Sequence, residues 1–520
     1  MKAITSIIII SLVFLGSVSA QNITNTLGST GIFTIKDGVN SYFSLSQSNG
    51  TINLISPLAG SQRGSIFKGT DRFFHTYYGT GTIGNNTFIG LLSGNFTMGG
   101  SGSQGSYNTG VGNQTLTSLT TGKSNSGFGL QSLYTNTTGS NNSAFGSSSL
   151  YANITGSSNS AFGVGSLFFN TTGSYNSAFG EFALANNSSG IDNSAFGLQS
   201  LYSNTTGYNN SAFGYNSLYY NTTGYNNSAF GFQSLFANTT GWFNSAYGNY
   251  SLSNNNTGHH NSAFGYHSLY ANNAGSYNSA FGFQSLFSNT TGNYNSSYGY
   301  LSSYNNTTGS HNCAYGYESL SSNTTGTANT AIGNYALDVC TGNFNTAIGD
   351  SSGSYLTSGS NNVTIGYFAQ VPSLTGNNQV RLGNYLITYA GIQVAWTVTS
   401  DRRLKKNILS SNLGLSFINK LRPVSYIRKN DESERTEYGL IAQEVEDALK
   451  QEQTENTGML TVTDDGEYQL RYNDLLAPMI KAIQELKAEN DRVKAQNEEL
   501  MTRIIRLEKK GGQLTNVKQE

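Results

Sequence analysis

Charge is scarce through most of this 520-residue chain. Residues 1–400 carry only 7 Lys or Arg and 7 Asp or Glu, so 41 of the 55 charged side chains lie in the last 120 residues. The long N-terminal part has no basic patch to bind a phosphate backbone, and the short C-terminal part is balanced in charge. Nucleic acid is therefore not expected as a partner, and the change near residue 400 divides the chain in two.

Cysteine is nearly absent. Cys313 and Cys340 are the only two, which is too few for a disulfide framework. Whether they pair is open from the sequence, and two small buried side chains are the favoured interpretation.

Long apolar runs are missing as well. The run from Ile7 to Leu15 follows Lys2 and precedes the small residues Val18-Ser19-Ala20, which is the pattern of a secretory signal peptide over residues 1–20. A membrane anchor is the alternative, but this run is too short to span a bilayer. No later segment is apolar enough either, so we expect a secreted, extracellular or virion-surface protein.

Residues 108–366 are one repeat of seventeen residues. Fourteen glycines, from Gly112 to Gly333, follow one another in strict register, and Gly349 and Gly366 continue the series after one shortened unit. The unit reads N-S-A-F-G-x-x-S-L-(Y/F)-x-N-T-T-G-x-x. So short and strict a period predicts a solenoid, because low-complexity disorder does not hold a phase over so many units.

Each unit is expected to supply two short strands, SAFG and SL(Y/F), with a turn at NTTG, where Asn and Gly tolerate positive φ. Phe145 and Leu150 exemplify the two positions predicted to fill the stacked core. Coils this thin bury little apolar surface alone, so we expect a homotrimer. Residues 21–107 do not repeat and are predicted to form a β-rich cap.

Three late units carry a recognisable motif. They read NTAIG at Asn329–Gly333, NTAIG at Asn345–Gly349 and NVTIG at Asn362–Gly366. The repeat resembles the head β-roll of trimeric adhesins, in which such units stack as the coils of a trimer.

Two other patterns carry no site. GSGSQG at Gly100–Gly105 matches a dinucleotide fingerprint but lacks a strand–helix context, and glycine is abundant here. His259 and His260 are adjacent and are expected to point to opposite faces. We expect no cofactor and no metal.

The C-terminal part reads as a neck, a small α+β domain and a coiled coil. Alternating apolar residues predict strands in the neck, residues 367–400. Residues 401–475 contain a strand in LRPVSYIRK, a strand and helix in YGLIAQEVEDAL and a hairpin in LTVTDDGEYQLRY. Asn473 is then expected to cap a long helix that ends at Gly511-Gly512.

Residues 476–510 have the heptad pattern of a trimeric coiled coil. Asn490 and Asn497 occupy two a positions, and the other a and d positions are apolar: Leu476, Met479, Ile483, Leu486, Val493, Leu500, Ile504 and Leu507. Polar a layers fix the register of a coiled coil. A helix packed on its own domain is the alternative.

Residues 399–408, TSDRRLKKNI, stand at the joint. This stretch gathers one serine, one aspartate and four basic residues within ten positions. The blocks SDRRLKKNI, LRPVSY, YGLIAQEVE and IKAIQEL resemble the intramolecular chaperone of phage tailspikes and endosialidases, a self-cleaving serine peptidase family that also includes the processing domain of myelin regulatory factors. The resemblance implies trimerisation, templated folding of the upstream β-structure, and a cut at Ser400–Asp401 with Ser400 as nucleophile and Lys405 as base.

The route of the cut stays open. Ser400 cannot readily attack its own carbonyl, because a four-membered ring would form. Cleavage after Ser400 is compatible with attack by water, by Asp401 or by a group on another chain, whereas cleavage before Ser400 fits an N-to-O acyl shift.

Two functions are compatible with the sequence. The first is a trimeric fibre or adhesin that binds surface glycans through recurring aromatics such as Tyr134, Phe168 and Tyr208. The second is a structural coat fibre that is itself glycosylated. Eight Asn-Thr-Thr triplets could accept glycans in a eukaryotic host: Asn136, Asn170, Asn204, Asn221, Asn238, Asn289, Asn306 and Asn323.

Overall fold

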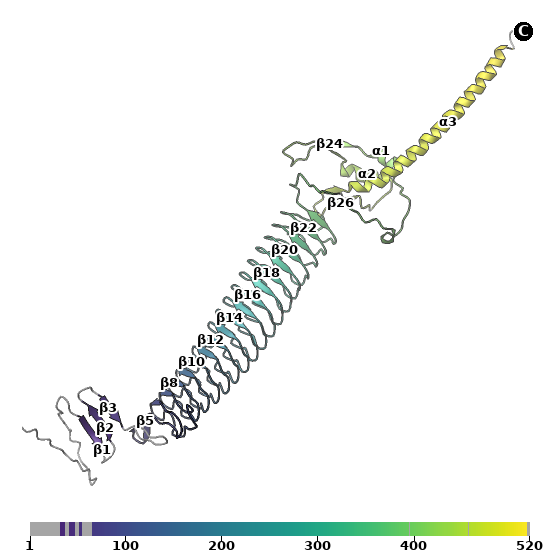
Figure 1. The fold of residues 1–520 in the computed structure, drawn as a ribbon. Coiled ribbons are helices and arrows are strands. Elements are labelled where there is room, and N and C mark those ends of the chain that lie inside the picture. The colour runs from purple at the N-terminus through teal and green to yellow at the C-terminus, as the bar shows by residue number, and fades with distance from the viewer. Residues whose placement is uncertain are drawn as a thin grey trace, which may run out of the picture. The chain divides into compact units, whose positions relative to one another are not determined.

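A computed structural model describes residues 32–36, 41–46, 51–54, 65–394, 396–455 and 457–516. The expected signal peptide lies outside these residues. The chain divides into two compact units, Met1–Thr172 and Gly173–Glu520, which are described separately. The predicted architecture is confirmed: a β-solenoid, a small α/β region near the C-terminus and one long C-terminal helix (Figure 1).

The first unit begins with antiparallel strands and continues as solenoid. β1, β2 and β3 form one antiparallel sheet, β4 pairs with β5, and β5 pairs with β6. β6 lies inside the predicted cap and pairs in parallel with β7 at the start of the repeat. The strands are β1 (Ile32–Lys36), β2 (Ser41–Ser46), β3 (Thr51–Leu54), β4 (Ile66–Lys68), β5 (Asp71–His75), β6 (Thr87–Ile89), β7 (Thr109–Val111), β8 (Ser126–Phe128), β9 (Ser143–Phe145) and β10 (Ser160–Phe162).

The second unit continues with one parallel strand per coil, each in register with the next. The ladder passes beyond residue 366 to β23. The strands are β11 (Ser177–Phe179), β12 (Ser194–Phe196), β13 (Ser211–Phe213), β14 (Ser228–Phe230), β15 (Ser245–Tyr247), β16 (Ser262–Phe264), β17 (Ser279–Phe281), β18 (Ser296–Tyr298), β19 (Cys313–Tyr315), β20 (Thr330–Ile332), β21 (Thr346–Ile348), β22 (Val363–Ile365) and β23 (Val380–Leu382).

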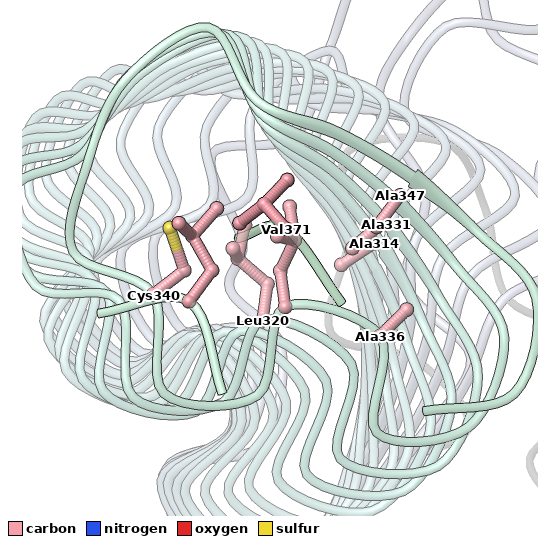
Figure 2. Close-up of a cluster of buried hydrophobic side chains, with 9 residues drawn as sticks. Ala314, Leu320, Ala331, Ala336, Cys340, Ala347 and Val371 are labelled. Carbon is pink, nitrogen blue, oxygen red and sulfur yellow. The ribbon is translucent and has the colours of Figure 1, made fainter. Parts of the chain in front are cut away.

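The core differs from the predicted one. Leu150 is fully buried as expected, but Phe145 is only half-buried and Ala144 takes the interior place. Successive strand residues point to opposite faces, so a three-residue strand with Ala in its middle turns its Phe outward. Figure 2 shows such interior side chains in the last coils, with Leu320, Cys340 and Val371 near alanines of successive strands.

The prediction of a second strand at SL(Y/F) is wrong. That segment is a turn, and its Leu is in the left-handed region, with φ of 51° at Leu150 and 52° at Leu218. Such a conformation is costly for a side chain like Leu and persists because the coil buries the Leu completely. Positive φ was expected at the Asn and Gly of NTTG instead, and neither Asn221 nor Gly224 adopts it.

Two asparagine ladders run through the interior. In the first, Asn210 donates from its side-chain amide to Asn193 Oδ1 at 3.1 Å and to Gly224 O at 2.9 Å. In the second, Asn221 donates to Asn204 Oδ1 at 2.8 Å and to the same Gly224 O at 3.0 Å. Each carbonyl of the second repeat glycine therefore ties both ladders together.

Glycine is required at that meeting point. A Cβ on Gly224 would lie 2.3 Å from Asn221 Oδ1 and 2.4 Å from the carbonyl oxygen of Gly241 in the next coil. The second glycine of the unit thus serves close approach between coils and not a positive φ.

The second ladder ends at Cys340, which takes the place of the next asparagine. Asn323 still donates to Asn306 Oδ1 at 2.8 Å, but its own buried Oδ1 has no hydrogen-bond partner. Both cysteines are free thiols; Cys340 is buried as expected, whereas Cys313 is half-buried on a strand.

The C-terminal region has a small apolar core of its own. Leu413, Phe417, Val445, Leu449 and Met459 are buried together. Its elements are α1 (Leu415–Lys420), β24 (Val424–Tyr426) paired with β25 (Glu437–Gly439), α2 (Ala442–Gln451), β26 (Leu460–Val462) paired with β27 (Tyr468–Leu470), and α3 (Leu476–Asn516). The predicted strands, helix and hairpin are confirmed.

Three local expectations here are wrong. Asn473 lies inside a 3-10 turn, Tyr472–Leu475, and does not cap α3. Gly511 and Gly512 lie within α3, which continues to Asn516. In the neck, the described residues after β23 contain no strand, and Val394, Trp396 and Val398 are about three-quarters exposed, at 76%, 74% and 74%. The alternation there has no partner strand within one chain.

The ladders predict a specific cost for losing one rung. Asn238→Ala leaves Asn221 Oδ1 buried without its donor, so the free energy of unfolding should fall by about 2 kcal/mol. Thr240→Ala, an exposed change in the same triplet, is the matched control and should alter it by less than about 0.5 kcal/mol. Denaturant unfolding of both variants as full-length Ser400→Ala chains checks this, and equal midpoints would contradict a structural role for the ladder.

Candidate functional site

A tight turn follows the neck and folds the chain back on itself. Arg402–Leu404 form one 3-10 turn, in which Leu404 N donates to Asp401 O and Lys405 N to Arg402 O, each at 3.1 Å. The Asp401 side chain caps this turn, since its Oδ1 accepts from Arg403 N at 2.8 Å. The turn brings residue 405 back toward residue 400.

Ser400 and Lys405 meet there. Lys405 Nζ donates to Ser400 Oγ at 2.6 Å. This is hydrogen-bonding distance for proton exchange between a lysine and a serine hydroxyl, the arrangement in which a neutral amine can withdraw the hydroxyl proton. Two of the three residues singled out from the sequence are therefore side by side.

The third, Asp401, pairs with Arg403. Its two carboxylate oxygens accept from Arg403 Nε at 3.2 and 3.0 Å, and Oδ2 also accepts from Nη2 at 2.6 Å. This side-chain pairing with Arg403, together with the bond from Arg403 N, lowers the pKa of Asp401. A carboxylate with both oxygens engaged is a poor nucleophile, which argues against cleavage through Asp401.

The site is open to solvent in one chain. Ser400 and Lys405 are exposed, and the apolar side chains of Leu404 and Leu409 are 75% and 87% exposed. Acyl chemistry is usually sheltered from water, and one chain brings Ser400 and Lys405 together without enclosing them.

Polar contacts join the C-terminal region to the end of the solenoid. At the tip of the β26–β27 hairpin, Asp464 N donates to Pro372 O at 2.9 Å, and Asp464 Oδ2 accepts from Leu374 N at 2.6 Å. Each of these bonds uses a backbone atom on the solenoid side.

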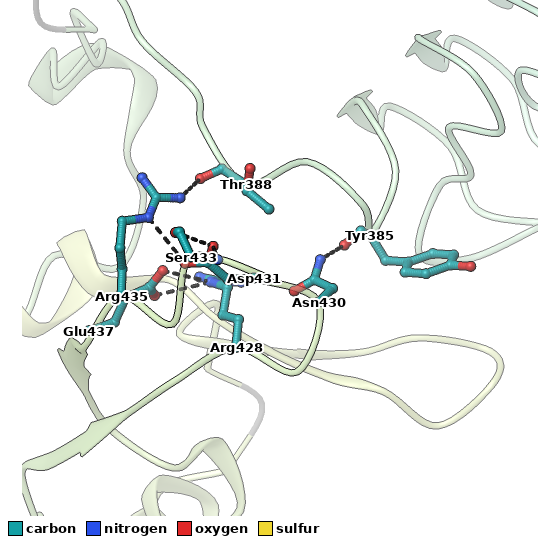
Figure 3. Close-up of polar contacts among 8 residues, drawn as sticks. All are labelled: Tyr385, Thr388, Arg428, Asn430, Asp431, Ser433, Arg435 and Glu437. Carbon is teal, nitrogen blue, oxygen red and sulfur yellow. Dashed lines mark hydrogen bonds and ion pairs between the residues drawn. The ribbon is translucent and has the colours of Figure 1, made fainter.

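The β24–β25 loop makes similar contacts with the neck (Figure 3). Asn430 donates to the carbonyl of Tyr385, and Arg435 Nη2 donates to Thr388 O at 3.1 Å. Asp431 holds this loop by accepting from Ser433 Oγ at 2.5 Å and from Arg435 Nε at 3.1 Å. The bond from Ser433 is the main reason that the pKa of Asp431 falls to about 2.

The sequence did not reveal these loop contacts or the Arg403 pairing. The letters DDG predicted a hairpin turn, whereas no prediction was made for the charged stretch RKNDESER at residues 428–435. Which backbone they would meet depends on the tertiary fold, and the local pattern carries no signal of it.

Other candidate sites gain no support. Among the described residues, no group of three or more His, Cys, Asp or Glu is placed to hold a metal. The expectation that His259 and His260 point to opposite faces is wrong, since their ring centroids lie 5.5 Å apart and Trp242 contacts both rings. Within the described helices, none is long and apolar enough to cross a membrane.

Comparison with known proteins gives one match. Residues 400–454 match a peptidase family model described as the chaperone of endosialidase. The match begins at Ser400 and takes in the turn, α1, the β24–β25 pair and α2. No curated protein and no solved structure matches the chain.

The pairing of Asp401 with Arg403 predicts a change on titration. Arg403→Ala should raise the pKa of Asp401 because its main partner is lost. Because the pKa of Asp401 is lower in the folded turn than in an unfolded chain, its ionised carboxylate stabilises the turn at pH values above the ordinary pKa of aspartate. That stabilisation is lost as the pH falls through the lowered pKa. The variant turn should therefore loosen at a higher pH than the native turn.

An NMR titration of the Asp401 carboxyl in full-length chains measures this. Arg402→Ala is the control, since the described contacts of Asp401 do not include the Arg402 side chain. Equal Asp401 pKa values in both variants would contradict the pairing.

Proposed function

We propose that this chain is an exported or virion-associated homotrimeric fibre, and that its C-terminal domain directs assembly and then separates by self-cleavage at Ser400–Asp401. The observation that carries the proposal is the 2.6 Å contact between Lys405 Nζ and Ser400 Oγ, at the first residue of the segment that matches the endosialidase chaperone. It is a single-turnover reaction, because the substrate is the chain itself.

The cut separates a durable rod from a disposable domain. In the reaction, water adds across the Ser400–Asp401 peptide bond, so the serine gains a carboxylate and Asp401 gains a free amino group. Lys405 acts as base toward Ser400, and because Ser400 cannot readily reach its own carbonyl, the activated hydroxyl attacks the same bond in another chain or relays the proton of an attacking water. In the first case Asp401 leaves as a free amine, and water then hydrolyses the ester on the attacking serine. The engaged carboxylate of Asp401 favours attack by water or by a group from another chain over attack by Asp401 itself.

Trimerisation is supported by apolar surface that one chain leaves uncovered. The apolar a and d residues of α3 are all partly exposed. Val493 has the smallest exposed fraction, 42%, and Leu507 the largest, 67%. Two polar a layers, Asn490 and Asn497, would set the register of a coiled coil over residues 476–510. The exposed apolar neck would gain its missing strand partners from the other two chains, which would also enclose Ser400.

A template is needed because the coils are nearly identical. Chains that slip by whole coils keep every local contact, so many registers have similar energy. The domain over residues 401–475 forms hydrogen bonds with backbone atoms of Pro372, Leu374, Tyr385 and Thr388. These bonds give the three chains a common end from which to align.

The rod is the part that would bind a surface, and its neutral face suits uncharged glycans. Its aromatics form columns of parallel rings, for example Tyr208 and Tyr225 at 4.9 Å and 8°. Within a column each ring face is covered by the next ring, so sugars meet hydroxyls and ring edges. The expected stacking of sugars on open ring faces is thus restricted to the ends of columns.

The alternative of a coat fibre glycosylated on its Asn-Thr-Thr triplets is disfavoured. All eight asparagines are fully buried in the second ladder. Asn221, for example, donates to Asn204 and accepts from Asn238. A glycan on such a nitrogen would remove the ladder bond and could not fit inside the coil.

The cut predicts a simple set of variants. Wild type should release a 120-residue fragment that begins at Asp401, at a first-order rate once trimers exist. Ser400→Ala should assemble into the same trimer yet stay intact, because only the hydroxyl is lost. Lys405→Arg keeps the positive charge but cannot serve as a base, and should also stay intact.

N-terminal sequencing of the fragment and light scattering of the intact variants check this. Cleavage of Ser400→Ala, a cut far from residue 400, or monomeric Ser400→Ala each contradicts the proposal.

The burial of the Asn-Thr-Thr asparagines predicts which sites can carry glycans. After expression in a eukaryotic secretory host, soluble rods should carry none at Asn204 or Asn221. Asn209, exposed in the triplet Asn209-Asn210-Ser211 on the same coils, is the internal control for access to the transferase. Glycopeptide mass spectrometry of protease-resistant trimers measures all three, and occupancy at Asn204 would restore the coat alternative.

A further inference from the structure

The outer face of the solenoid strands has a uniform composition. In the second unit the middle strand residue points inward up to β22, and the first and third residues point outward. The first position is Ser in eight strands and Cys, Thr or Val in five, and the third is always Phe, Tyr, Ile or Leu. The third residues are Phe179, Phe196, Phe213, Phe230, Tyr247, Phe264, Phe281, Tyr298, Tyr315, Ile332, Ile348, Ile365 and Leu382.

The turns are different. All six charged residues between positions 73 and 380 lie on turns and none on a strand: Lys123, Glu181, Asp192, Glu318, Asp338 and Asp350. Because the repeat occurs many times in one chain, the residue types at each position of the unit can be compared from coil to coil. Turn positions accept Lys, Asp, Glu, Gln, Asn and His, whereas the outward strand positions accept no charge in any coil.

This strand face is long and only partly covered. Its thirteen third-position residues stack at about 4.8 Å intervals, over ~60 Å. Tyr315, Ile332 and Ile365 are 39%, 41% and 40% exposed, and the phenylalanines are half-buried. At roughly 50 Å² of apolar surface per rung, the stripe offers about 650 Å², close to the ~800 Å² that each partner buries in a stable interface.

A partner for this stripe must match it rung by rung. A second copy of the chain, aligned in the same coil register, presents the same apolar residue at the same interval. We propose that the strand face is the seam between copies, and that the faces of three chains meet along the axis of the rod. This rests on the proposed trimer but goes beyond it, since it assigns which surface is enclosed and leaves the turn columns outside.

Cys313 provides a built-in reporter. It takes the outward first position of β19, whereas Cys340 lies inside its own coil with Sγ accepting from Asn345 at 3.3 Å. In a three-fold seam the Cys313 thiols of the three copies come near one another, and the Cys340 thiols remain separated by the coil walls.

The first test is cross-linking of full-length Ser400→Ala protein with a short bismaleimide. Most chains should become covalent dimers. Adding Cys313→Ser to the Ser400→Ala protein should reduce the dimers to the level seen without cross-linker. As a positional control, Cys313→Ser combined with Tyr215→Cys places the thiol on a turn column of the second unit and should give no dimer. Dimers from Tyr215→Cys but not from Cys313 would overturn the proposal.

The second test places a charge on each surface. Phe213 stacks on Phe196 at 4.6 Å and Tyr215 on Phe232 at 5.2 Å, so Phe213→Asp and Tyr215→Asp each remove one ring from a column of the same coil. Phe213→Asp buries a charge in the seam and should shorten the protease half-life of the trimer about tenfold or more, whereas Tyr215→Asp should change it less than about twofold.

The outcomes separate the two proposals. If Ser400→Ala is a monomer, the trimer itself is wrong. If it is a trimer in which Cys313 does not cross-link and Phe213→Asp behaves like Tyr215→Asp, the trimer stands and the strand face is not its seam.

Discussion

The buried asparagine amide is the interaction on which the rest of the solenoid depends. An amide can donate and accept along one axis, so a single residue type at a fixed position forms an unbroken chain of hydrogen bonds from coil to coil. Asn210 illustrates this, because both its backbone N–H and its side-chain amide donate to Asn193 Oδ1. Each coil therefore satisfies its buried polar groups only when a neighbouring coil presents the same residue at the same height.

This constraint explains the composition of the repeat. The interior is narrow, and a typical coil holds one Leu, one Ala, one Ser and two Asn, with the second glycine needed where both ladders share a carbonyl. Charges have no place in such an interior, and between positions 73 and 380 they lie on turns. The scarcity of charge over these coils is thus a consequence of how they bond to each other.

The same constraint makes assembly difficult. Because the coils are nearly identical, the asparagine ladders stabilise each coil on its neighbour in the same chain. They do not determine which coil of one chain lies beside which coil of another chain. A fixed end is the remedy, and the C-terminal domain contacts the last coil and the neck through backbone atoms such as Pro372 O and Thr388 O. Removal of that domain by the proposed cut would leave the finished rod stable through its barrier to unfolding.

Much of this was predictable from sequence where the signal was periodic or local. The seventeen-residue period predicted the solenoid, Leu150 was placed in the core, and the DDG turn predicted the β26–β27 hairpin. The resemblance to the self-cleaving chaperones implied Ser400 and Lys405 as a dyad, and the structure brings the two side chains into contact.

What failed depended on tertiary geometry. Phe145 was placed inside because it is large, yet a three-residue strand centred on Ala144 must turn its neighbours outward. Leu150 in a left-handed turn contradicts its local preference and is held there by burial. Gly511 does not end α3, since a glycine ends a helix only where the chain turns away.

The most direct measurement of the central claim is a comparison of refolding. Cut wild-type rods, freed of the C-terminal fragment, and intact Ser400→Ala trimers are unfolded in denaturant and returned to native buffer at equal concentration. If the domain sets the register of the ladders, intact trimers should recover their protease resistance and cut rods should aggregate or remain misaligned. Cut rods that refold as efficiently as intact trimers would show that the coils find their register alone and would contradict the account.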